Sequence, residues 1–137
     1  MEPLTKDLLA AAERQWEAHG SDSYNLTLQV EAARMEKVVY DMVVRSGKIA
    51  AMKRNGQDIP PEHAEDYSIS GLFHLLRQEL RLMEKGADGT PDALAEVFAR
   101  FDPQTGRLDR YRRTTIKNRF LRLQVLKYEV GATASND

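Results

Sequence analysis

"YNLTLQVEAARMEKVVYDMVVRSGKIAAMK", residues 24–53, is the stretch whose apolar pattern decides the predicted fold. One series of positions advances by alternating steps of four and three, as on one face of an α-helix: Leu28, Ala32, Met35, Val39, Met42, Ser46 and Ile49. A second set widens that face: Leu26, Ala33, Tyr40, Val43 and Ala50. Because so wide a face needs more than one packing partner, we predict the long central helix of a bundle. A dimeric coiled coil is the alternative.

Four further segments carry helical signals, with capping residues or a proline before an apolar stripe and a glycine or a turn after it: 3–20, 68–86, 90–101 and 107–131. Either Ser68 or Ser70 is suited to cap the second of them. We identify no segment with sustained period-two alternation of branched and aromatic residues, which would indicate a β-strand. The sequence therefore predicts an all-α protein, a compact helical bundle of about five helices.

Composition indicates a globular chain. It has 137 residues, of which 42% are hydrophobic and 30% charged, with a formal net charge of -1. We expect a single helical domain over residues 1–131, followed by a flexible tail at 132–137. The chain contains no cysteine, which suits a reducing compartment, and its apolar runs fall far short of the ~20 residues that span a bilayer. We expect a soluble, cytoplasmic protein that does not enter a membrane.

Positive charge is concentrated near the C-terminus. Residues 107–128, "RLDRYRRTTIKNRFLRLQVLKY", hold eight cations against one acid, Asp109, a balance of +7. Residues 57–102 hold ten acids against four cations, a balance of -6. We predict that the basic segment is an amphipathic helix that docks on the bundle through its apolar residues and exposes its cations.

Such a helix suits phosphate binding, because cations that neutralise phosphates release condensed counterions from a nucleic acid. The predicted binding residues lie within this segment: Arg107, Arg110, Arg112, Arg113, Lys117, Asn118, Arg119 and Arg122. Asn118 is the candidate for base recognition. Residues 90–101, the turn "DPQTG" at 102–106 and the basic helix together outline a C-terminal helix-turn-helix. The alternative is that the arginines pair with the acidic middle of the chain or cover a solvated face.

A secondary basic patch is predicted at the end of the central helix: Arg45, Lys48, Lys53 and Arg54. It extends the phosphate-binding surface in one interpretation. In the other, these cations stabilise the C-terminus of the helix through the macrodipole.

Signals for chemistry are sparse. His19, His63 and His74 have no metal-ligand spacing, and no glycine-rich phosphate loop is present. A cluster of Glu62, His63, Glu65 and Asp66 is the candidate for a third, enzymatic interpretation, but its acids also suit the first turn of the next helix. We therefore predict a protein that is not an enzyme and has neither a metal site nor a cofactor.

From about Asn25 to Ala93 the sequence follows a helix, "SGKIAAMKRNG", "IPPEHA", a second helix and "LMEKGADGTPDA". This order resembles the small terminase subunits of tailed phages, in which paired helices flank a basic loop. The resemblance implies a helical oligomer that recognises phage DNA and delivers it to a packaging motor. The basic residues after Gly106 are not part of the likeness.

Two functions follow from these patterns. The first is a non-enzymatic helical protein that binds nucleic acid, DNA more than RNA, through its basic C-terminal helix and forms homo-oligomers through its apolar helices. The second is a protein–protein interaction module, an adaptor, inhibitor or assembly subunit, whose basic helix binds an acidic protein partner.

Overall fold

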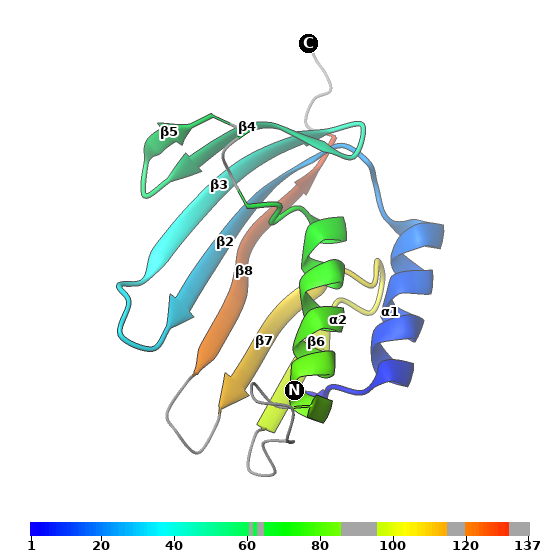
Figure 1. Ribbon diagram of the computed structural model, residues 1–137. Helices are drawn as coiled ribbons and strands as arrows, with labels where there is room; N and C mark the ends of the chain where they lie inside the picture. Colours follow the sequence, from blue (N-terminus) through cyan, green and yellow to red (C-terminus); the bar gives the residue numbers. More distant parts are fainter. Residues whose placement is uncertain (61, 63–64, 86–95, 115–119, 132–137) are drawn as a thin grey trace.

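The computed structural model describes residues 1–60, 62, 65–85, 96–114 and 120–131. The described residues form two helices and eight strands (Figure 1), so the predicted all-α helical bundle is wrong. The helices are α1 (Lys6–His19) and α2 (Ile69–Lys85). The strands are β1 (Glu2–Pro3), β2 (Tyr24–Ala32), β3 (Val38–Arg45), β4 (Lys48–Arg54), β5 (Gln57–Ile59), β6 (Glu96–Phe101), β7 (Leu108–Thr114) and β8 (Leu121–Val130).

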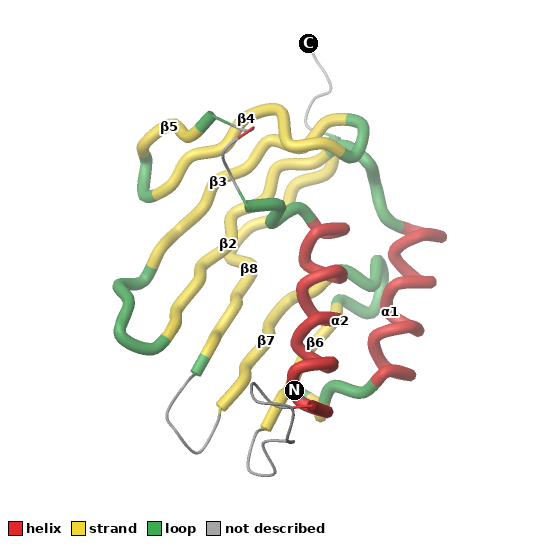
Figure 2. The backbone as a smooth tube through the Cα atoms, in the orientation of Figure 1, coloured by secondary structure: helices red, strands yellow, loops and turns green. Residues whose placement is uncertain are grey.

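The strands form one antiparallel sheet in the order β1-β6-β7-β8-β2-β3-β4-β5. Both helices lie on the same side of this sheet (Figures 1 and 2). We name the side that packs against the helices the inner face and the opposite side the outer face. Within the described ranges, no helix covers the outer face.

Residues 24–53 form β2, β3 and most of β4 instead of a central helix. In β2 the buried Tyr24, Leu26 and Leu28 alternate with the partly exposed Asn25 and Thr27. This is the period-two pattern of a strand with one face on the core, so the statement that the sequence lacks such alternation was wrong. β3 and β4 each end at a two-residue turn with positive φ, at Ser46-Gly47 and at Asn55-Gly56.

The predicted C-terminal helix-turn-helix is also wrong. Residues 96–101 form β6, and the basic segment forms β7 and β8, which pair with each other. Only the turn prediction is confirmed: the Asp102 carboxylate accepts hydrogen bonds from the backbone N–H and the hydroxyl of Thr105, at 2.9 and 2.8 Å. Residues 102–107 thus connect β6 to β7 as a hairpin.

Two of the predicted helices are confirmed. In α1 the Thr5 hydroxyl accepts the N–H of Leu8 at 3.1 Å, and Gly20 ends the helix. In α2 the Ser68 hydroxyl accepts the N–H of Gly71 at 3.2 Å, which makes Ser68 the N-cap. In both segments the sequence showed an apolar stripe of helical period and residues suited to the ends of a helix, and these two signals predicted the same helix.

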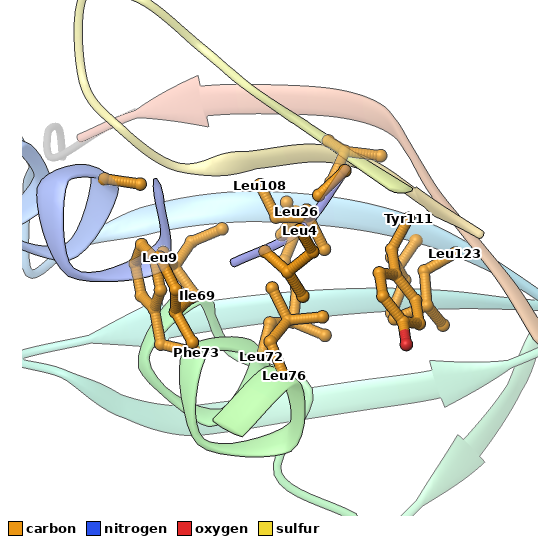
Figure 3. Close-up of a cluster of buried hydrophobic side chains, with 14 of the residues drawn as sticks. Leu4, Leu9, Leu26, Ile69, Leu72, Phe73, Leu76, Leu108, Tyr111 and Leu123 are labelled. Carbon is orange, nitrogen blue, oxygen red and sulfur yellow. The ribbon is translucent and has the colours of Figure 1, made fainter. Parts of the chain in front are cut away.

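The core lies between α2, α1 and the inner face of the sheet (Figure 3). Ile69, Leu72 and Leu76 of α2 are fully buried and lie near Leu26 and Leu108 of the sheet. Burying each such side chain contributes about 1.5–3 kcal/mol, so the stripe of α2 is a principal source of stability.

A hydroxyl group links the sheet to the start of α2. The Tyr24 hydroxyl on β2 accepts a hydrogen bond from the backbone N–H of Ile69 at 2.8 Å. Burial raises the pKa of this tyrosine from its ordinary value of 10.0 to about 12, because the phenolate is poorly solvated there. The neutral phenol is therefore the form compatible with the folded chain.

The β6–β7 turn packs against α1. The Gln15 side chain donates to the backbone carbonyls of Pro103 and Gln104, at 3.3 and 2.9 Å. Gly106 has a φ of +83°, and a Cβ at this position would lie 2.3 Å from the carbonyl oxygen of Ala12. Glycine is thus required both by the backbone conformation and by the closeness of α1.

Replacing Gly106 with alanine tests this contact. Gly47→Ala is the matched control, because Gly47 has a similar φ of +78° but nothing within 4 Å of the new Cβ. The control pays only the left-handed backbone strain, about 1–2 kcal/mol, whereas Gly106→Ala adds a steric clash of about 1–3 kcal/mol. Urea unfolding should show the larger loss for Gly106→Ala, and equal losses would contradict the docking of this turn on α1.

Alkaline pH should destabilise the protein through Tyr24. The pKa of this group is raised in the folded state, so above pH 10 the unfolded chain releases a proton that the folded chain retains until about pH 12. The free energy of unfolding should fall in this window, by about 3 kcal/mol for Tyr24 alone. Tyr24→Phe should lower stability at pH 7, because the Ile69 N–H loses its acceptor, but reduce the alkaline slope. An unchanged slope in the variant would refute this assignment.

Candidate nucleic-acid interface

The basic segment is divided between the two faces of the sheet. In β7, Tyr111 is buried on the inner face, and Arg110 and Arg112 on either side of it point outward. Arg113 returns to the inner face. The predicted continuous cationic surface of one helix is therefore replaced by two groups of arginines in different environments.

The inner group is neutralised inside the fold. Arg113 donates from one nitrogen to both carboxylate oxygens of Glu79 on α2 at 2.8 Å, and Tyr111 donates to the same carboxylate at 2.7 Å. Burial and the nearby Glu79 charge raise the pKa of Tyr111 well above its ordinary value. Because removal of one partner would leave a buried charge, this trio ties α2 to β7.

Arg107 also belongs to the interior. Its side chain is 17% exposed, its guanidinium lies 4.8 Å from the centre of the Tyr128 ring, and it donates to the Leu108 carbonyl at 3.1 Å. Arg107 and Arg113 were both predicted to bind phosphate, and the structure places them away from the outer face. Arg113 pairs with Glu79 of the acidic middle of the chain, as the alternative prediction has it, whereas the ion pair of Arg107, at 3.8 Å, is with Asp109 inside the basic segment.

The outer group combines residues from three neighbouring strands. Arg110 and Arg112 come from β7, Arg122 comes from β8, and Arg100 comes from β6. We name these four residues the outer arginine cluster. Arg100 lies directly opposite Arg110, and Arg112 lies directly opposite Arg122. Like charges at directly opposite positions destabilise a sheet, so this arrangement has an energetic cost.

Carboxylates relieve part of this repulsion. Asp109 lies 3.2 Å from Arg100, and Glu31 lies 3.7 Å from Arg122. The side chains of Arg100 and Arg122 nevertheless remain 64% and 52% exposed, so these pairs contribute at most about 1 kcal/mol each. Among the described residues, Arg110 has no ion-pair or hydrogen-bond partner for its side chain. Arg112 likewise has neither kind of partner among the described residues, so an incoming anion meets two guanidinium groups without a carboxylate and two weakly paired ones.

Two phenylalanines complete the cluster. The guanidinium of Arg112 lies 5.1 Å from the centre of the Phe98 ring, and that of Arg122 lies 4.7 Å from the centre of the Phe120 ring. These are cation–π contacts, which hold each guanidinium in place over an aromatic ring. Since Arg112 and Arg122 are directly opposite, the two stacks are neighbours.

Sequence reasoning missed Arg100, Phe98 and Phe120 as members of this surface. Arg100 and Phe98 lie in "EVFARF", where buried Val97 and Ala99 alternate with residues of the outer face. That alternation, together with the hairpin turn that follows it, was the signal that could have found them. The predicted residues Lys117, Asn118 and Arg119 lie outside the described part of the chain.

The secondary basic patch is divided: Arg45 and Lys48 lie directly opposite each other beside the β3–β4 turn, and Lys53 and Arg54 lie at the other end of β4. Arg45 donates to the backbone carbonyls of Tyr24 and Val44, and Lys48 occupies the end of the β3–β4 hairpin. Arg54 lies opposite Tyr40, whereas Lys53 faces the other side of β4. These four cations are not at a helix C-terminus, so the macrodipole explanation is wrong.

A shallow trough of about 240 Å³ lies on the outer face, toward β3, β4 and β5. Two lysines in its lining, Lys53 and Lys127, are matched by three acids, Asp41, Asp58 and Glu129. The trough therefore does not extend the positive charge of the outer arginine cluster, and Lys53 lies about 19 Å from β7 at ordinary strand spacing.

Other candidates for chemistry stay apart. The Asp66 carboxylate accepts the hydroxyl and the backbone N–H of Ser68 at 2.6 and 3.1 Å, in front of α2, while His63 lies outside the described residues. Within the described ranges, no group of three or more His, Asp or Glu side chains is placed to hold a metal. Neither of the two described helices has the length and apolar character needed to cross a membrane.

Comparison with known proteins adds no family to this picture. No protein-family model matches the chain, and no curated protein matches it either.

Proposed function

We propose that this protein binds nucleic acid without chemistry, and that the outer arginine cluster contacts the phosphates. The observation that carries the proposal is the pair of arginine–arginine oppositions, Arg100 with Arg110 and Arg112 with Arg122, on a sheet face that no described helix covers. A surface maintained at a cost to stability is typical of a functional site. A phosphate between the guanidinium groups would remove that cost.

The chemistry of arginine supports a phosphate ligand. A guanidinium offers several N–H donors in a plane, which matches two oxygens of one phosphate. Cations arranged along a surface also displace counterions from a nucleic acid, which gives affinity that depends on salt. The Glu31 carboxylate is a weakly held competitor for Arg122, so a phosphate can replace it at little cost, whereas Asp109 also pairs with Arg107 and stays beside Arg100.

Several earlier expectations remain predictions beside this proposal. DNA is expected over RNA, and the likeness to terminase subunits stays untested. However, residues 25–45, which would supply the first helix of that likeness, form β2 and β3 with the turn between them. Self-association also stays a prediction. The apolar residues on which it was based, such as Met42 and Leu72, are now accounted for by the core.

Removing two cluster charges should weaken binding. For Arg100→Gln with Arg110→Gln, the slope of log affinity against log salt concentration should become shallower by about 1.5, as expected for two lost phosphate contacts. The control is Arg14→Gln with Arg81→Gln, which removes the same charge from exposed positions on α1 and α2. Fluorescence anisotropy with labelled DNA at several salt concentrations measures both. Equal loss in both variants, or no binding by the wild-type protein, would reject the proposal.

Removing one cluster charge should raise the stability of the fold, although it weakens binding. Arg110→Gln removes one of two opposed positive charges and leaves the Arg100–Asp109 pair intact. The free energy of unfolding should therefore rise by about 0.2–1 kcal/mol at low salt, and the gain should shrink as salt screens the repulsion. A clear loss of stability would mean that Arg110 has a structural role.

A further inference from the structure

We infer that the nucleic acid is single-stranded, and that two of its bases stack on the neighbouring Arg112–Phe98 and Arg122–Phe120 stacks. This inference rests on the proposed function and adds the form of the ligand. It concerns a different part of the outer arginine cluster from the Arg100–Arg110 pair, which carries the charge argument.

The geometry favours bases over phosphates at these two positions. Each guanidinium lies over a phenyl ring, at 5.1 Å for Arg112 and 4.7 Å for Arg122, measured to the ring centre. A guanidinium held against a ring can stack a second flat group on its other side; the Arg122 side chain is 52% exposed, and Arg112 is partly exposed. Single-stranded nucleic acids are bound in this way, with unstacked bases on aromatic rings or on guanidinium planes.

The two stacks rise from neighbouring positions of the sheet. Residues at directly opposite positions of paired antiparallel strands have Cβ atoms about 4.5–5.5 Å apart. Arg112 and Arg122 occupy such positions, so their guanidinium groups rise from adjacent points of the sheet. Duplex bases are already stacked inside the helix and cannot reach these planes without being flipped out. The surface therefore fits an unpaired strand.

The adjacent row supplies groups for the backbone and for base edges. It runs Arg100, Arg110, Gln124, Gln29 across β6, β7, β8 and β2. The arginines of this row can hold phosphates, while the glutamine amides offer donors and acceptors toward bases or sugars. A strand lying across the sheet would thus contact stacking groups on one side and charged or amide groups on the other.

Charge alone also permits an acidic protein segment on this face. An acidic peptide offers carboxylates to Arg100 and Arg110 but has no regular series of flat rings for the two stacks. Recognition of unpaired bases uses the two guanidinium–phenyl stacks as well as the Arg100–Arg110 pair. Recognition of an acidic peptide uses only the arginine charges. The stacks therefore decide between the two ligands, and they also provide the test.

The decisive variant is Arg112→Lys with Arg122→Lys, which retains both charges but removes both planar groups. The matched control is Arg14→Lys with Arg81→Lys on the helices. Anisotropy would be measured with a short labelled single strand of mixed sequence, with its duplex, and with heparin as a competitor without bases. The wild-type protein should prefer the single strand, and the decisive variant should lose at least about tenfold in affinity for it. Heparin and duplex binding should be nearly unchanged.

A second variant, Phe98→Leu with Phe120→Leu, should reproduce this selective loss while every charge is kept. Circular dichroism and urea unfolding verify that both variants retain the fold. Equal affinity of the wild-type protein for single strand and duplex, with no selective loss in either variant, would overturn the inference and leave the proposed function intact. Binding of heparin or of poly-glutamate without binding of any oligonucleotide would overturn both and favour the acidic protein partner.

Discussion

The constraint on which this structure depends is that successive side chains of a strand point to opposite faces, and that both helices pack on one of those faces. The stripe of α2, with Ile69, Leu72 and Leu76, requires an apolar surface opposite it. The inner positions of β2, β7 and β8 supply that surface, for example Leu26, Tyr111 and Leu123 (Figure 3). Every residue between these positions is directed outward by the same geometry. The polar outer face is therefore a direct consequence of how the core is made.

This sorting explains why arginines from one short segment behave so differently. Arg112 and Arg113 are neighbours in sequence, yet Arg113 meets a buried carboxylate and Arg112 lies over a ring on the outer face. The buried Glu79 carboxylate must be paired, because an unpaired buried charge is costly, and Arg113 is its cationic partner. The outer arginines face no buried carboxylate, and the repulsion between them is small enough for the fold to tolerate and large enough to be relieved by an anion.

The sequence predicted the helices well and the sheet badly, for identifiable reasons. Residues 69–85 combine a stripe of period 3.6 with a capping serine, and no other interpretation satisfies both signals. Residues 24–53 contain many apolar residues, so a series with steps of four and three can be drawn through them although Leu28 and Val39 lie on opposite faces. The strict alternation from Tyr24 to Glu31 and the turn signals at Ser46-Gly47 and Asn55-Gly56 carried the correct answer.

The candidate site was predictable only in part. The basic segment itself stood out by composition, and three of its arginines belong to the outer arginine cluster: Arg110, Arg112 and Arg122. Arg100 and Phe98 join them through the pairing of β6 with β7, which is a relation between strands and is invisible in one segment alone. The division between inner and outer arginines depends in addition on the register of that pairing.

One extra residue sets this register. Arg100 pairs with Arg110 and Phe101 pairs with Leu108, so Asp109 is an unpaired bulge residue in β7. Without the bulge, strict alternation from the buried Leu108 would direct Arg110 and Arg112 toward the core and Tyr111 toward solvent. With it, Leu108 and Tyr111 both reach the inner face, and the two arginines point outward. The bulge also brings the Asp109 carboxylate within 3.2 Å of Arg100, where it moderates the repulsion that the new register creates. A single inserted residue thus produces both the outer arginine cluster and the carboxylate that holds part of it in place.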